Sequence, residues 1–231
     1  MTGHALRYVW WQVRDRAGQR TLVCVIIALA FSIPVFVAGR DGNLPPDAGT
    51  SMLRAMFAQL SLIFALVLGG GLIANDRRQG WYRFYLAKPV SPVWFYGQSI
   101  VLAVLGMVVA SLAFVAIFSR ALRVSWSWHP ATDGLLMFAL VGMTVIFWSA
   151  LVRRDWLAGL VTYMVVIMLR DLLRRGDSVI GDVGNVILPP MHLVGRLRPL
   201  TTTEVVWIVS WAVLLFAATL VLLRIRPLGE D

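Results

Sequence analysis

Six long apolar runs constrain this chain more than any other feature of its sequence. Each run approaches the roughly 20 residues that an α-helix needs to cross the hydrocarbon core of a membrane. The chain is 59% hydrophobic and 14% charged. Soluble domains contain about 45–50% hydrophobic residues and about 25% charged residues. The sequence therefore predicts an all-α polytopic membrane protein whose spans cover residues 21–38, 55–74, 95–118, 135–152, 156–169 and 205–223.

The fifth run is shorter than the others, because Arg170 and Asp171 follow it after about 14 apolar residues. We expect either a tilted helix packed against its neighbours or a helix that ends before the far interface. All six runs belong to a single transmembrane domain, residues 21–231.

The distribution of Lys and Arg predicts the orientation, since cytoplasmic loops carry an excess of these residues. With the amino terminus inside, twelve lie on the cytoplasmic side: Arg7, Arg14, Arg16, Arg20, Arg77, Arg78, Arg83, Lys88, Arg153, Arg154, Arg224 and Arg226. The first two outer loops have four: Arg40, Arg54, Arg120 and Arg123. The last loop opposes the rule with Arg170, Arg174, Arg175, Arg196 and Arg198. Because the first spans usually dominate, we expect both termini to be cytoplasmic.

Residues 1–20 precede the first span and carry apolar side chains at helical spacing. Leu6, Val9, Trp10, Val13 and Ala17 share one face. This pattern predicts an interfacial amphipathic helix whose aromatic face enters the acyl boundary while its Arg residues meet anionic headgroups. An ordinary positive flank with aromatic residues at the interface is the alternative.

A cytoplasmic loop, residues 75–92, separates the second span from the third. It follows "GGGLIAND" and contains "RRQGWYRFYLAKP", in which Trp81, Phe84, Tyr85 and Lys88 recur at helical spacing. Pro89 ends this pattern. The loop is therefore expected to form a short amphipathic helix that contacts lipid headgroups or another protein.

This region resembles the second-to-third-span region of type-2 exporter permeases of the ATP-binding-cassette superfamily. Asp76, Gly80, Pro89 and Gly97 match the acidic residue, the glycine, the proline and the later glycine of that family's pattern. The chain departs from it at three positions, with Asp76 for the commoner Glu, Trp81 for a small hydroxyl residue and Gln98 for Lys. The specific resemblance covers about 25 residues, and the six-span layout extends it loosely over the chain.

The resemblance implies that the loop is a coupling helix that docks into a separate ATP-hydrolysing subunit. The implied docking residues are Asp76, Arg77, Arg78, Gly80, Trp81, Arg83, Phe84, Lys88 and Pro89. ATP and Mg would be bound by that partner ATPase, and no cofactor is expected in this chain. A second permease copy or a related permease would complete the translocation path. A loop helix that faces lipid without a protein partner is the alternative.

The last loop, residues 170–203, contains "VILPPMHLVGRL", which is too apolar for a solvated loop and too short for a span. We expect a re-entrant segment on the outer side, broken at Pro189 and Pro190. The resemblance implies that it helps to close the exit as an outer gate. A helical cap without substrate contact is an alternative, and the loop would be cytoplasmic if the orientation were reversed.

The remaining residues argue against an ion-coupled pump, an enzyme and a metal-binding protein. Ion-coupled pumps usually require ionisable residues within the membrane. No such residue lies deep inside the apolar runs of this chain. The sequence lacks a GxxxxGK[ST] phosphate-binding loop and an HExxH motif, so we expect neither an enzyme nor a metal site. Cys24 is the only cysteine and lies inside the first span.

The formal net charge of +9 comes from residues at the ends of the runs. This placement favours binding to anionic lipid headgroups rather than to nucleic acid. We therefore expect an integral protein of the bacterial inner membrane, a permease subunit that exports an amphipathic, lipid-like or drug-like substrate. A scaffold, assembly factor or lipid scramblase that works without an ATPase is the alternative.

Overall fold

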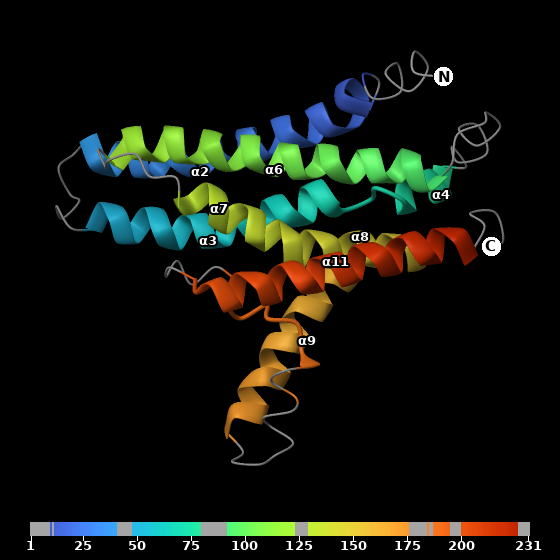
Figure 1. The fold of residues 1–231 in the computed structure, drawn as a ribbon. Helices are drawn as coiled ribbons and strands as arrows, with labels where there is room; N and C mark the ends of the chain where they lie inside the picture. The colour runs from blue at the N-terminus through green and yellow to red at the C-terminus, as the bar shows by residue number, and fades with distance from the viewer. Residues whose placement is uncertain are drawn as a thin grey trace.

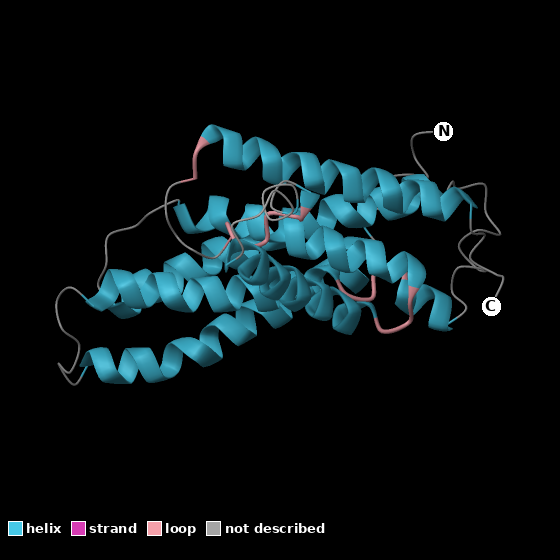
Figure 2. Cartoon of the chain, turned by 90° about the horizontal axis from the view of Figure 1, so that it is seen from below, coloured by secondary structure: helices cyan, strands magenta, loops and turns pink. Residues whose placement is uncertain are grey.

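The computed structural model describes residues 10, 12–40, 48–79, 92–122, 129–175, 184, 187–194 and 200–225. Over these ranges the chain consists of helices and loops and contains no strand (Figure 2). Six helices are long and apolar enough to cross a membrane. The prediction of an all-α protein with six membrane spans is thus confirmed at the level of helix length and composition.

In the part of the chain that the structure describes, eight helical segments form the six spans, because the fourth span is interrupted. The long helices are α2 (Gly18–Arg40), α3 (Ala48–Gly69), α6 (Pro92–Leu122), α9 (Asp155–Arg175) and α11 (Thr202–Ile225). The fourth span joins α7 (His129–Met137), the π-helical turn η2 (Phe138–Gly142) and α8 (Met143–Leu151). A second π-helical turn, η1 (Val13–Ala17), leads into α2.

The π-helical turn in the fourth span lies where this span crosses α3. A Cβ atom added at Gly69 would be 2.9 Å from the carbonyl oxygen of Gly142, so only glycine permits this approach of the two backbones. Small residues at such crossings allow transmembrane helices to pack closely. Single π-helical turns are inserted in helices frequently at functional sites.

One end of the bundle gathers segments that are far apart in the sequence. The first turn of α2, the short helix α4 (Ala74–Gln79), the first turn of α6 and the last turn of α11 all lie there (Figure 1). We call it the elbow end. The helix α9 runs away from the other spans (Figure 1).

Several span boundaries differ from the sequence prediction, and the structure explains two of them. The second span ends at Gly69 rather than at residue 74, since Gly71 adopts a positive φ of 67° that stops the helix. The fifth span is longer than predicted, because α9 continues through Arg170 and Asp171 to Arg175. Arg170 is buried, with its guanidinium carbon 5.2 Å from the centre of the Trp207 ring on α11.

The leader is helical from residue 12 onward and continues into α2 without a break. Residues 1–9 and 11 lie outside the described part of the chain. The interfacial placement of residues 1–20 stays a prediction.

Candidate functional site

The connection between α3 and α4, residues 70–76, forms a bend that we call the elbow. Gly70 still donates its backbone N–H to the carbonyl of Leu66 at 2.8 Å, as in a continuing helix. Gly71 then turns the backbone into the left-handed region, which a side chain would disfavour. The elbow therefore redirects the chain toward the loop that leads to the third span.

A serine of the fourth span accepts hydrogen bonds from the elbow backbone. Ser149 Oγ accepts from the N–H groups of Ile73 at 3.0 Å and Ala74 at 2.9 Å. These N–H groups lie at the start of α4, where a helix leaves its first donors without internal partners. Ser149 is fully buried, so it replaces water as their acceptor and fixes the elbow against α8.

Asp155 attaches the same elbow to the fifth span. Its Oδ2 accepts the backbone N–H of Gly71, and its Oδ1 accepts the N–H of Trp156 at 2.8 Å. The carboxylate lies in the first turn of α9, where the helix dipole favours negative charge. Because Asp155 is 3% exposed, its two hydrogen bonds form away from water and are of the stronger, charge-assisted kind.

Asp76 and Tyr96 hold the two ends of the loop that follows. The Tyr96 hydroxyl donates to Asp76 Oδ2 at 3.2 Å, and both side chains are buried. Asp76 belongs to α4 and Tyr96 to α6, so this contact brings together the chain before and after residues 80–91. The described chain on either side of residues 80–91 is thus held together at these two residues.

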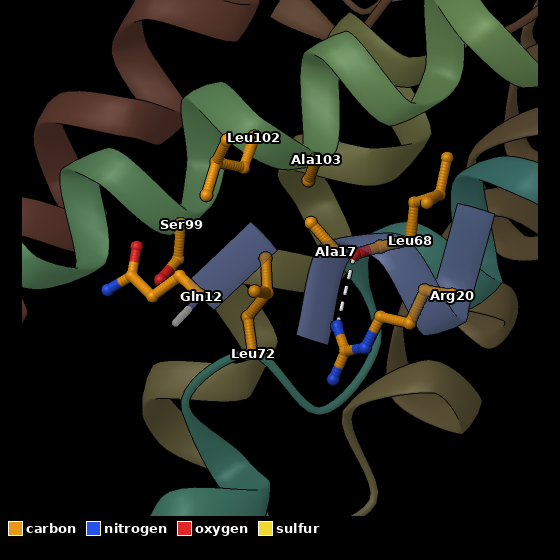
Figure 3. A pocket seen from close by; sticks show the side chains of 8 residues that line it. All are labelled: Gln12, Ala17, Arg20, Leu68, Leu72, Ser99, Leu102 and Ala103. Atoms are coloured by element: carbon orange, nitrogen blue, oxygen red, sulfur yellow. Dashed lines mark hydrogen bonds between the residues drawn. The ribbon is translucent and has the colours of Figure 1, made fainter. Parts of the chain in front are cut away.

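The helix that precedes the first span also contacts this region. Gln12 Nε2 donates to the carbonyl of Phe95 at 3.3 Å. In the first turn of α2, an Arg20 guanidinium N–H donates to the carbonyl of Leu68 at 3.2 Å (Figure 3). Figure 3 shows the cavity between these contacts, which has about 10 Å³ of free volume. That is about enough for one water molecule, so the cavity is too small to hold a substrate.

The structure describes only part of the predicted docking segment. Asp76 is described with its side chain, and Arg77 and Arg78 lie in α4 with only their backbone described. The remaining predicted docking residues lie outside the described part of the chain: Gly80, Trp81, Arg83, Phe84, Lys88 and Pro89. Their role stays a prediction.

The predicted outer gate residues lie in an irregular segment, residues 187–194. Pro189 accepts a hydrogen bond from Met191 N at 2.8 Å, and Pro190 accepts one from Leu193 N at 3.0 Å. Pro190, Met191 and Leu193 are buried. Irregular backbone at membrane depth needs such cover by protein, although the re-entrant placement and the gate role stay predictions.

Sequence reasoning missed two residues of the elbow network, Ser149 and Asp155. Neither Ser149 nor Asp155 is among the site residues that the sequence predicts. An acidic residue in a first helical turn does signal an N-terminus. The sequence could not show that Asp155 also accepts the N–H of Gly71, because Gly71 lies 84 positions earlier in the chain.

Within the ranges that the structure describes, there is no group of three or more His, Cys, Asp or Glu side chains that could hold a metal ion. Comparison of this chain with protein-family models, with curated proteins and with solved structures yields no match.

Proposed function

We propose that this chain is the transmembrane permease subunit of an ATP-binding-cassette transporter of the type-2 exporter kind. It would export an amphipathic, lipid-like or drug-like substrate, with ATP hydrolysed by a separate subunit. The observation that carries the proposal is the elbow network, in which Asp76, Ser149 and Asp155 fix the chain just before the predicted docking loop. The resemblance of residues 73–98 to the coupling region of those permeases supplies the partner.

In this mechanism the ATPase acts on residues 80–91, and the elbow network transmits the displacement. Asp76 and Tyr96 couple the loop to α6, Ser149 couples it to α8, and Asp155 couples it to α9. ATP binding would draw two ATPase subunits together and move the loop with these helices as one body. The path between two permease copies, or between this chain and a related permease, would then switch from inward-open to outward-open.

The burial of Asp76 assigns it a particular part in this mechanism. Its carboxylate is 3% exposed and accepts a hydrogen bond from within the chain, so we assign it to anchoring the loop rather than to touching the ATPase. Arg77, Arg78 and the aromatic residues of the loop would make the contact. The proposal requires the elbow end, and with it both termini, to face the cytoplasm of a bacterial inner membrane.

The test is to purify the tagged chain gently from its native host and to identify co-purifying ATPase and its ATP hydrolysis. Replacing Arg77 and Arg78 by Glu, or Gly80→Pro, is expected to abolish co-purification while membrane insertion stays intact. The matched control replaces Arg153 and Arg154 by Glu, since this exposed pair lies in another connection between spans and should leave co-purification unchanged.

Two results would contradict the proposal. A chain that purifies without any ATPase would favour the scaffold or scramblase alternative. Equal loss of the ATPase in the control pair would show that general charge, rather than the predicted docking loop, governs the association.

A further inference from the structure

A groove opens between α6 and α11 at the elbow end of the bundle. Its volume is about 540 Å³, within the range of roughly 300–1,000 Å³ that is usual for ligand sites. Trp94, Val101 and Leu105 form one wall, and Phe216 and Leu220 form the other. Both helices are membrane spans, so the surroundings of this groove are the hydrocarbon chains of one leaflet.

Gly97 gives the groove its depth. A Cβ atom added at Gly97 would meet nothing within 4 Å, so this glycine is not required by close packing of two helices, unlike Gly69. A larger side chain at this position would enter open space and occupy part of the groove. The lining is otherwise apolar except for Gln98.

Polar and aromatic groups stand at the mouth of the groove nearest the helix ends. Leu220 and Arg224 are four residues apart on α11, so they lie on the same face, with Arg224 one turn closer to the membrane surface. Arg224 is exposed. Trp94 begins the opposite wall and is 63% exposed, as is typical of tryptophan at the level of the headgroups.

We propose that this groove binds an acyl chain of an anionic phospholipid from the leaflet at the elbow end. The chain lies along Val101, Leu105 and Phe216, and the headgroup phosphate pairs with the Arg224 guanidinium. The exposed Arg224 cation beside an apolar groove favours an anionic lipid as the occupant over a second copy of the protein, since a second copy would bring its own Arg224. Arginine recognises phosphate through strong, charge-assisted hydrogen bonds. The inference requires only that α6 and α11 span a membrane, and it is independent of the permease proposal.

The test is native mass spectrometry of the full chain after reconstitution in vesicles of equal parts phosphatidylglycerol and phosphatidylcholine. We expect the unaltered chain to retain phosphatidylglycerol in preference to phosphatidylcholine. Arg224→Gln should lower phosphatidylglycerol retention about fivefold, because one basic residue near a membrane surface contributes about 1 kcal/mol to the attraction of anionic lipid. Gly97→Phe should remove most of the retained lipid of both kinds, since its ring fills the groove.

Two control variants match these changes outside the groove. Arg153→Gln removes another exposed arginine, and Val209→Phe enlarges another exposed position on α11, where Val209 is 45% exposed. Both should retain lipid as the unaltered chain does.

Three results would overturn the inference: lipid retention unchanged by Arg224→Gln and Gly97→Phe, equal losses in the controls, or a dimer that Gly97→Phe converts to monomer. The last would identify a second copy as the occupant. Should Gly97→Phe fail to give a monodisperse protein, Arg224→Gln decides alone, because that side chain is exposed.

Discussion

The fourth and fifth spans, Ala131–Leu151 and Asp155–Leu173, follow one another in the sequence and have similar lengths of 21 and 19 residues. Their environments differ greatly, since in an 18-residue window of each span 67% of the residues of the fourth are buried inside the protein and only 17% of those of the fifth. Apolar composition cannot separate the two cases, because lipid tails are as apolar as a protein core. Central and peripheral spans are distinguished by the close contacts that neighbouring helices permit.

The near half of the fifth span is attached to the fourth by specific contacts. Trp148 Nε1 donates to Thr162 Oγ1 at 2.8 Å, and a Cβ at Gly159 would overlap with Val145. Farther along, the exposed face of α9 carries Met164, Val165 and Met168. The comparison therefore teaches that the fourth span depends on packing along its length, whereas the fifth depends on attachment at its start and at Arg170.

The largest expected effect tests the packing of the fourth span. Ile146→Ala should lower the free energy of unfolding by about 2 kcal/mol or more, because Ile146 is fully buried and its truncation leaves a cavity. Met168→Ala on α9 is the matched control. It should change the free energy of unfolding by less than about 0.5 kcal/mol, since Met168 is 65% exposed. Unfolding of the purified protein in mixed micelles measures both. Equal effects would show that α9 is as closely packed as α8.

The next effect tests the attachment of α9 at the elbow. Asp155→Ala should lower the free energy of unfolding by about 1–3 kcal/mol, because the half-buried N–H of Gly71 loses its acceptor. Asp155→Asn keeps an acceptor oxygen, so it should lower the free energy of unfolding by less than Asp155→Ala does.

Hydrogen exchange of a peptide that covers residues 70–76 reports this contact directly, and it should accelerate in Asp155→Ala. Asp171→Ala, at an exposed position on the same helix, serves as control. Unchanged exchange in Asp155→Ala would mean that Ser149 alone is enough to hold the elbow.

The smallest effect tests the attachment at the far part of α9. Trp207→Leu should lower the free energy of unfolding by about 1 kcal/mol, since a cation–π contact with Arg170 contributes roughly 0.5–2 kcal/mol. Trp207→Phe retains a ring face and should cost less. Hydrogen exchange of residues 166–173 should accelerate while that of α8 does not. If α8 accelerated equally, Trp207 would stabilise the whole bundle rather than this helix.

The sequence predicts parts of the elbow without predicting its structure. The sequence places three consecutive glycines before Leu72, where the structure has a bend at Gly71 and a close approach of two backbones at Gly69. It also predicted that Asp76 matters, but not that the carboxylate is buried against Tyr96. The length of α9 was underestimated, because a charged pair normally ends an apolar run, whereas here Trp207 covers Arg170.

By itself the sequence determined that six helices form and approximately where each one lies, since a continuous apolar run of sufficient length satisfies its own backbone only as a helix in lipid. The tertiary structure alone decided which of these helices is central and which residues hold the elbow. The reason is that Ser149 and Asp155 act on backbone groups 75 to 84 positions away. A local pattern carries no information about contacts at that separation.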